Sequence, residues 1–418
     1  MNNEPKIMNR SLVVLGAVLI QLCLGAIYAW SVFTPGLKEA GWTNVQTQIV
    51  FSTGLAFFAI VMVFAGKKLA IWGPKKLAFL AGVTLGLGYL LAGLSGGSNF
   101  WLILFCIGVI GGSGIGLGYV VPISVGMRWF PDKKGMITGL AVAGFGFGAM
   151  GWVKLAGAWG HLINNFGLSA TFMIYGILFA GLTIIGSIWM KYPPEGWLPI
   201  GFNPEAFKKE NAATIGDNLR PGEMLKTLPF YLVFLIFTFT AGAGLMSIGL
   251  MKLYPMQALQ ENGFDIAAAS AIAGTAMAVF FSLANGIGRI VWGTLSDKLG
   301  RKRSVLIMAL SQGIIVLLFT RMAGTPFLLY LGATIIGFNF GGNFALFPAF
   351  TADLFGDKNV GLNYPYVYLS YGVGGILGPI LGGILGDIGN FALAFTICGV
   401  LCLLGAGLAA MIKHPGKV

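Results

Sequence analysis

Charged side chains are scarce in this sequence of 418 residues, where Asp, Glu, Lys and Arg together make up only 10%. Soluble globular domains carry about 25% charged residues. The chain is instead 56% hydrophobic, with a mean hydropathy of +0.84. An ordinary soluble domain is therefore excluded, and the sequence predicts an all-α, polytopic membrane protein.

Cysteine and histidine are also rare. The four cysteines all lie in apolar runs: Cys23, Cys106, Cys398 and Cys402. Neither His161 nor His414 stands at a zinc-type spacing from them. We therefore expect thiols that pack between helices, and neither a disulfide nor a metal site.

Signals for enzymes and for nucleic-acid binding are missing too. There is no glycine loop of the Walker type, and the glycine runs near 111–118 and 372–375 lie in apolar segments, where small residues let helices approach closely. The net charge is +12, but nearly all of it flanks apolar segments. We expect no cofactor, no enzymatic activity, no ATP drive and no nucleic-acid partner.

Twelve apolar segments are present, each near the ~20 residues needed to cross about 30 Å of hydrocarbon. They cover residues 11–36, 46–66, 77–95, 100–126, 136–160, 168–190, 228–256, 266–295, 304–321, 326–351, 362–386 and 391–412. Lys6 and Arg10 precede the first segment, without the small-residue cleavage site of a signal peptide. We expect this segment to be retained.

Basic residues are distributed unequally between alternate loops. The loops on the side of the N-terminus contain most of the Lys and Arg, whereas the opposite loops contain Lys38 and Arg321. By the positive-inside rule both termini are cytoplasmic. The sequence thus predicts a multi-pass membrane protein with both termini in the cytoplasm.

A polar segment divides the chain into an N-terminal half (1–190), a cytoplasmic linker (191–227) and a C-terminal half (228–418). The halves repeat, because Gly66-Lys67-Lys68 and Gly73-Pro74-Lys75-Lys76 match the stretch from Gly293 to Arg303 at an offset of 227. Two pseudo-symmetric six-helix halves, with substrate near the bilayer midplane between them, are a recurring transporter plan.

The second copy of this repeat contains Gly293, Asp297, Gly300 and Arg301 in the pattern Gly-x-Leu-x-Asp-x-x-Gly-Arg-Lys. It resembles the loop motif of the major facilitator superfamily, whose fold and gating role the resemblance implies here. The first copy departs from the motif, with Ala70 in place of Asp and Pro74 in place of Arg. The motif, and any gating salt bridge, is incomplete there.

Further stretches are distinctive in combination: Tyr28-x-Trp30, Arg128-Trp129-Phe130-Pro131-Asp132-Lys133-x-Gly135, Pro193-Pro194-x-Gly196-Trp197, Glu223-Met224-Leu225-Lys226-Thr227, Asn285-Gly286-x-x-Arg289 and Asn363-Tyr364. Together they resemble the oxalate/formate antiporter family and the related bacterial monocarboxylate transporters, over nearly the whole chain. The resemblance implies transport of a small organic anion.

Only three cations lie within the predicted spans, namely Lys154, Lys252 and Arg289, and no carboxylate lies in a span interior. Such a cavity has positive potential, so the substrate is expected to be an anion. An Arg at a helix centre costs about 2.5–3.5 kcal/mol and is by default a functional residue. Its planar fork suits a carboxylate, which the matching arginine binds in the antiporter family; the alternative is snorkelling to the cytoplasmic face.

Three more polar residues are candidates for the site. Asn285 lies one turn before Arg289 on the same helix face, and either contacts substrate or packs between helices. Alignment on Asn363-Tyr364 places Tyr371 where the oxalate carriers have a second cation, a lysine, which favours a monocarboxylate. Lys252 either supplies a second charge or snorkels outward, as does Lys154.

Aromatic residues complete the predicted pocket. Tyr28 and Tyr119 could reach a carboxylate with their hydroxyls, while Phe340 and Phe344 would surround a short chain. Ordinary helix packing is the alternative for each of them. Trp30, Phe338, Tyr366 and Tyr368 are further candidates.

The sequence and the resemblance therefore predict a monomeric secondary transporter of small organic monocarboxylates such as formate, acetate, lactate or pyruvate. It is expected in a bacterial-type inner (plasma) membrane, working by alternating access. Oxalate/formate exchange and proton-coupled symport are alternatives, and a non-transporting receptor on the same fold is a distant one. Asn285 stands where animal proton-coupled carriers have an Asp. Because Asn cannot titrate, exchange or facilitated diffusion is favoured over proton symport.

Overall fold

The computed structural model describes residues 8–157, 159–199, 201 and 218–413. Twelve of its helices are long and apolar enough to span a membrane, and no strand occurs in this part of the chain. The all-α, twelve-span prediction is confirmed.

Six spans precede the linker. They are formed by α1 (Arg10–Leu24) with the 3-10 helix η1 (Gly25–Val32), α3 (Asn44–Trp72), α4 (Pro74–Leu94), α5 (Phe100–Ile103) with the π-helix η2 (Leu104–Gly111) and α6 (Gly112–Trp129), α7 (Lys134–Ala156) and α8 (Leu162–Ser187). The short α2 (Thr34–Glu39) follows η1, and α10 (Pro221–Met224) lies in the linker.

Six spans follow the linker. They are α11 (Leu228–Leu250), α13 (Ile266–Thr275) with the π-helix η3 (Ala276–Phe281) and α14 (Ser282–Leu299), α15 (Arg301–Met322), α16 (Pro326–Phe355), α17 (Val360–Asp387) and α18 (Phe391–Met411), with the short α12 (Leu253–Glu261) after α11. The predicted seventh span, 228–256, was too long, because α11 ends at Leu250 and α12 starts separately.

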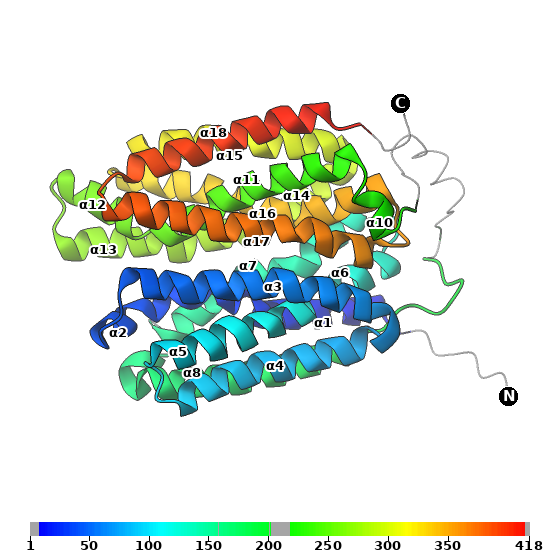
Figure 1. The fold of residues 1–418 in the computed structure, drawn as a ribbon, viewed down its shortest axis with the longest axis horizontal. Coiled ribbons are helices and arrows are strands. Elements are labelled where there is room, and N and C mark those ends of the chain that lie inside the picture. Colours follow the sequence, from blue (N-terminus) through cyan, green and yellow to red (C-terminus); the bar gives the residue numbers. More distant parts are fainter. Residues whose placement is uncertain (1–7, 158, 200, 202–217, 414–418) are drawn as a thin grey trace.

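The helices before the linker lie on one side of the molecule and those after it on the other (Figure 1). Between the two groups, α7 packs against α14 and α16, and α3 packs against α17. We call the end of the bundle next to α10 the linker end. Helix α1 starts there and α18 ends there, as Figure 1 shows.

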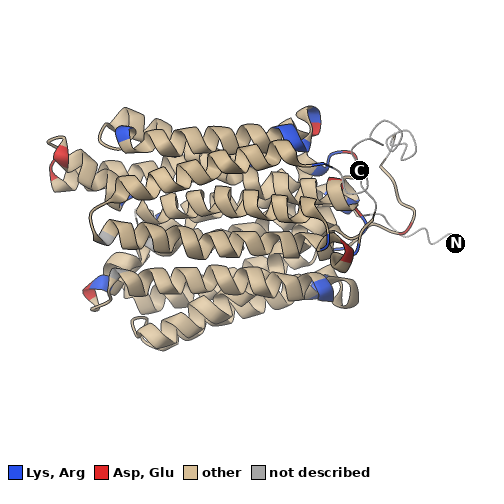
Figure 2. Cartoon of the chain, turned by 45° about the horizontal axis from the view of Figure 1, so that its top comes forward, with Lys and Arg blue, Asp and Glu red and all other residues tan. Residues whose placement is uncertain are grey.

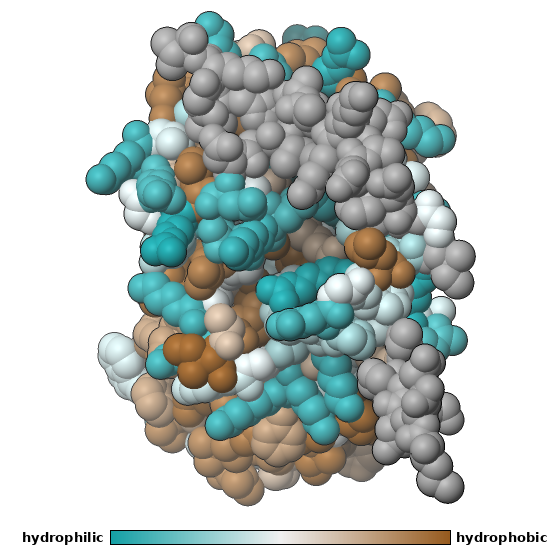
Figure 3. All heavy atoms as spheres, turned by 90° about the vertical axis from the view of Figure 1, so that its right-hand side faces the viewer, coloured by the Kyte–Doolittle hydropathy of each residue, from teal (hydrophilic) through white to brown (hydrophobic). Residues whose placement is uncertain are grey.

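Charged residues gather at the two ends of the bundle, and the middle is almost free of them (Figure 2). Figure 3 looks onto the linker end, where hydrophilic side chains surround a few apolar ones. This distribution fits helices that cross about 30 Å of hydrocarbon.

Glycine makes the tight turns at the linker end. Gly73 (φ +75°) ends α3 and Gly300 (φ +83°) ends α14, a conformation that residues with a Cβ rarely adopt. Pro74 and Arg301 then start the next helices. The two turns occupy equivalent positions of the sequence repeat.

Candidate functional site

Arg289 lies at the interface between the two groups of helices and is fully buried. Its Nε donates a hydrogen bond to Asn285 Oδ1 (3.1 Å), and its Nη1 donates to the carbonyl of Val142 on α7 (2.9 Å). The remaining nitrogen, Nη2, is buried and has no hydrogen-bond partner among the described residues. The guanidinium is thus held from both sides with one donor group unused.

Two aromatic rings lie on either side of this guanidinium. Its Cζ is 4.2 Å from the ring centroid of Phe344 on α16 and 5.2 Å from that of Phe145 on α7. A cation over the face of an aromatic ring is attracted by the ring quadrupole, more so where water is excluded. One ring comes from a helix before the linker and the other from a helix after it, so both groups of helices build this environment.

Tyrosines pack against both rings. The ring of Phe145 lies 5.1 Å from Tyr28 and 5.5 Å from Tyr119, and Phe344 lies 5.4 Å from Tyr371. The hydroxyls of Tyr28 and Tyr371 are hydrogen-bonded to each other at 2.7 Å. The structure therefore brings these three predicted tyrosines together around Arg289.

Several hydroxyls in this cluster are buried without a hydrogen-bond partner in the described part of the chain: Tyr119, Tyr364 and Tyr368. An unpaired buried polar group costs about 1–3 kcal/mol, and native proteins seldom leave several together unless the site serves a function. With the free Nη2 of Arg289, these groups form a set of donors suited to an anion.

Arg289 also lacks a carboxylate partner. The ion pairs in the described part of the chain involve Lys134 and Arg301, and none involves Arg289. No cluster of His, Cys, Asp and Glu suited to a metal occurs among these residues either. The guanidinium charge therefore has no counter-charge among the residues that the structure describes.

Not every predicted residue joins the cluster. Phe340 does, with its ring 5.1 Å from Phe344 and 5.8 Å from Tyr28. Lys252 does not. It was assigned to the outer part of the seventh span, but it is exposed in the turn between α11 and α12, because α11 ends two residues earlier. Lys154 is half-buried in the last turn of α7.

The other aromatic candidates have local partners. Trp30 donates its indole N–H to the carbonyl of Thr47, and Phe338 packs on Trp292. Tyr366 lies beneath the ammonium of Lys67. Tyr368, in contrast, belongs to the cluster, since its ring is 5.1 Å from that of Tyr119.

Phe145 and the carbonyl of Val142 were missed by sequence reasoning. A backbone carbonyl leaves no signal in a sequence. Phe145 lies in the alternating run Gly144-Phe145-Gly146-Phe147-Gly148, which could have marked a helix that approaches others closely. Gly146 indeed packs against Gly286 of α14, where an added Cβ would lie 2.8 Å from backbone atoms.

The predicted loop motif connects the halves at the linker end, in a contact that we call the α14–α7 junction. Asp297 accepts hydrogen bonds from the backbone N–H groups of Gly135 (3.1 Å) and Met136 (2.9 Å) at the start of α7. It also pairs with Arg301 at 2.5 Å. A carboxylate at a helix N-terminus is favoured by the free N–H groups there.

Other residues extend this network beyond the prediction. Arg301 donates to Ser296 and, at 3.1 Å, to Asp353 at the end of α16. Lys134, at the start of α7, forms an ion pair with Asp357 of the other half. Gly300 supplies the turn, and Gly293 packs so closely on Gly135 that an added Cβ would lie 2.3 Å from its carbonyl oxygen.

Comparison with known proteins supports the same family. The family model of the Major Facilitator Superfamily matches residues 13–281 and 254–417. The chain is 29% identical to an uncharacterized MFS-type transporter, YhjX, of Escherichia coli K12, over 88% of this chain and 86% of that one. It is 24% identical to the oxalate:formate antiporter of Oxalobacter formigenes, over 96% and 90%.

Two further similarities are more distant. Apicoplast pyruvate carrier 1 of Toxoplasma gondii is 22% identical over 85% of this chain and 80% of that one. The crystal structure of the E. coli fucose:proton symporter FucP has the same fold, with a TM-score of 0.65 and 14% identity over 97% of this chain and 99% of that chain. Since the family model covers almost the entire sequence, the chain belongs to the Major Facilitator Superfamily of membrane transporters.

Proposed function

We propose that the protein is a secondary transporter of small organic monocarboxylates, acting as a monomer in a bacterial-type inner membrane. The observation that carries this proposal is the buried guanidinium of Arg289, which has an unused Nη2 and no carboxylate partner in the described structure. A carboxylate would neutralise this charge and accept from Nη2, and such charge-assisted hydrogen bonds are among the strongest in proteins.

The surroundings of Arg289 favour a short substrate. The rings of Phe145 and Phe344 cover the guanidinium, and the unpaired hydroxyl of Tyr119 can donate to a second oxygen. Two of the relatives are named for small carboxylates, as an oxalate:formate antiporter and a pyruvate carrier. Their names agree with the chemistry of this site.

The way in which Arg289 is held supports alternating access. We propose that the linker end is cytoplasmic and that the halves 1–190 and 228–418 rock about the substrate. Arg289 bonds to Val142 across the interface, and this bond must break when the halves separate. A bound carboxylate can then replace the carbonyl of Val142 as the acceptor.

Uptake of a labelled monocarboxylate into proteoliposomes tests this function. We expect uptake by the wild type and little by Arg289→Lys, because a point charge cannot reproduce the bidentate fork. Arg321→Lys is the matched control, since Arg321 is exposed at the end of α15. Binding of the anion without any transport would instead support a receptor.

Oxalate/formate exchange is the alternative within transport. The resemblance aligns Tyr371 with the second cation of the oxalate carriers, and the hydroxyl of Tyr371 bonds to that of Tyr28. A tyrosine can donate one hydrogen bond but cannot balance a second carboxylate. Strong competition by oxalate in the wild type would favour the alternative, whereas oxalate competition that appears only in Tyr371→Lys would favour the monocarboxylate.

For energy coupling we propose exchange or facilitated diffusion over proton symport. Asn285 bonds to Arg289 and cannot carry a proton. Strong stimulation of uptake by internal monocarboxylate would support exchange. Accumulation in vesicles without internal anion, driven by an inward proton gradient and abolished by a protonophore, would show symport.

A further inference from the structure

A basic pocket lies at the linker end of the first half, apart from Arg289. It has a volume of about 560 Å³ and lies between the turn that joins α3 to α4 and the segment that follows α8. Lys75, Lys76 and Lys191 line it together with aromatic residues, and none of its lining residues is acidic. The pocket is therefore positively charged.

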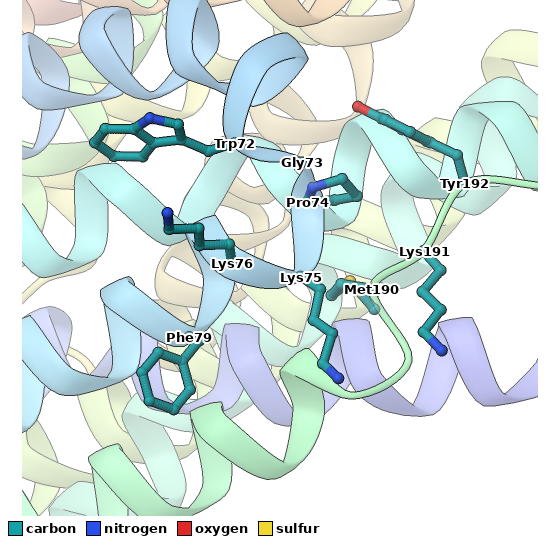
Figure 4. Close-up of a pocket in the computed structure, with 9 residues that line it drawn as sticks. All are labelled: Trp72, Gly73, Pro74, Lys75, Lys76, Phe79, Met190, Lys191 and Tyr192. Atoms are coloured by element: carbon teal, nitrogen blue, oxygen red, sulfur yellow. The ribbon is translucent and has the colours of Figure 1, made fainter.

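Two of the three ammonium groups are free to bind a ligand. In Figure 4, Lys75 and Lys191 extend in the same direction on either side of Met190. Neither side chain has a hydrogen bond or ion pair within the described structure. Lys76 turns the other way, with its Nζ 5.7 Å from the ring centroid of Trp72. The start of α4 adds the positive end of a helix dipole.

The far wall of the pocket is fixed by contacts with α6. The indole of Trp129 donates to the carbonyl of Lys191 at 2.8 Å. Tyr192 stacks under the guanidinium of Arg128, whose Cζ is 3.9 Å from the ring centroid, and its hydroxyl bonds to Ser124 at 3.2 Å. The lysine backbone is thus held in place by the protein itself.

One side of the pocket is apolar and faces away from the protein. Phe79 on α4 lines the pocket, and 44% of its surface is exposed. Ile71, close to the same turn on α3, is 74% exposed. Apolar residues exposed at the end of a membrane-spanning helix lie where acyl chains begin. Cations and apolar surface thus meet at the end of the spanning helices, where we expect lipid headgroups.

We propose that this pocket binds an anionic phospholipid, with its phosphate between Lys75 and Lys191 and its acyl chains along Phe79. The inference rests on the cytoplasmic orientation of the linker end proposed above, because basic pockets on the cytoplasmic side of membrane proteins bind anionic headgroups. A soluble phosphate would use the lysines but gain nothing from the apolar side. The lipid therefore fits more of the pocket than a free anion does.

Native mass spectrometry of the full chain in detergent tests the proposal, with phosphatidylglycerol titrated against phosphatidylcholine of the same acyl chains. We expect phosphatidylglycerol to bind more tightly. In Lys75→Gln/Lys191→Gln its affinity should fall about 30-fold, since each lysine near an anionic headgroup contributes about a factor of five to ten.

Two further double variants control for general surface charge and for folding. Lys226→Gln/Lys298→Gln removes the same charge from exposed residues outside the pocket and should leave affinity within about threefold of wild type. Lys75→Arg/Lys191→Arg keeps the charge and should retain binding, which separates loss of the site from loss of folding.

Three outcomes would overturn the proposal. Equal losses of phosphatidylglycerol affinity in Lys75→Gln/Lys191→Gln and Lys226→Gln/Lys298→Gln would show that general surface charge binds the lipid. That result would overturn the pocket as the binding site. Equal binding of phosphatidylcholine would overturn the requirement for an anion. Displacement of phosphatidylglycerol by an equal concentration of inorganic phosphate or glycerophosphoglycerol would identify a soluble anion as the ligand and overturn the lipid.

Discussion

The two halves approach each other at the linker end in two equivalent places that differ in chemistry. At the α14–α7 junction, Gly293 meets Gly135, and Asp297 accepts two backbone hydrogen bonds from α7. At its counterpart, which we call the α3–α17 junction, Gly66 also packs tightly on Gly361, although slightly less closely. There, however, Ala70 stands in place of Asp297.

This difference distinguishes the role of close backbone packing from the role of the charged residues. Close approach of the backbones does not require the carboxylate, because the α3–α17 junction achieves it without one. The network of Asp297, Arg301 and Lys134 must therefore contribute something else. We infer that it holds the linker end closed and breaks when the halves separate, whereas the α3–α17 junction closes by packing alone.

The same difference explains why the basic pocket lies in the first half. Where the second half has Arg301 within an ion-pair network, the first half has Pro74 followed by Lys75 and Lys76, which line the pocket. Without Asp, the basic residues of the first half have no carboxylate at this turn. Of these two lysines, Lys75 remains available to a ligand, whereas Lys76 lies against Trp72.

Asp297→Asn should have the largest effect on closure. It removes charge-assisted hydrogen bonds worth about 1.5–3 kcal/mol each, so opening at the linker end should increase about 30-fold. The measurement is alkylation of a reporter, Thr138→Cys, at a buried position one turn into α7. The protein without the reporter gives the background from its four buried cysteines.

Asp265→Asn is the matched control for this change. Asp265 caps the start of α13 by accepting from Ala268, and Asn caps a helix equally well. If Asp297→Asn alkylates no faster than Asp265→Asn, the carboxylate does not hold the linker end closed, and the proposed difference between the junctions disappears.

Gly293→Ala and Gly66→Ala should have similar, intermediate effects. An added Cβ would lie 2.3 Å from the carbonyl oxygen of Gly135 and 2.6 Å from that of Gly361, respectively. Overpacking of this kind costs about 1–3 kcal/mol, so reporter alkylation should rise about tenfold in each. Gly181→Ala, where the added Cβ meets open space, is the control. An effect at only one junction would contradict their common packing.

Lys134→Gln should have a smaller effect. It breaks the ion pair with Asp357, whose side chain is 49% exposed, and solvent screens such pairs to about 0.2–1 kcal/mol. We expect alkylation of the reporter to rise about threefold. The control is Lys133→Gln, which removes the charge of the exposed neighbouring lysine. An increase as large as that of Asp297→Asn would assign the main role to Lys134.

Ala70→Asp should have the smallest effect, in the opposite direction. It places a carboxylate near the start of α17, where a helix dipole contributes about 0.3–1 kcal/mol. Alkylation of the reporter should fall about twofold, and the neutral Ala70→Asn should not reproduce this. Faster alkylation would show that the α3–α17 junction cannot accept the motif residue it lacks.

The sequence was most informative where a charged or polar residue lies in an apolar segment, because burying it there costs free energy. Arg289 stood out because a guanidinium inside an apolar segment needs a reason, and Asn285 because it lies one turn away; the structure joins them by a hydrogen bond. The twelve spans followed from hydropathy and length. Lys252 was misplaced because hydropathy does not record where α11 ends and α12 begins.

The contacts between the halves could not be predicted from the sequence. The carbonyl of Val142 accepts from Arg289, and Phe145 packs against it, only because α7 and α14 meet in one register. Lys134 and Asp357 likewise pair across more than 200 residues. No helical periodicity fixes such a register, which depends on the close approach of glycines on two helices.

We propose above that Arg289 binds the carboxylate of the substrate. Isothermal titration calorimetry of the purified protein with formate, acetate, lactate, pyruvate and oxalate tests it most directly, using wild type, Arg289→Lys and the control Arg321→Lys. We predict that a monocarboxylate binds wild type and Arg321→Lys alike, and that Arg289→Lys weakens its binding about 10- to 100-fold. Unchanged affinity in Arg289→Lys, or no binding of any of the four monocarboxylates to wild type, would contradict the claim.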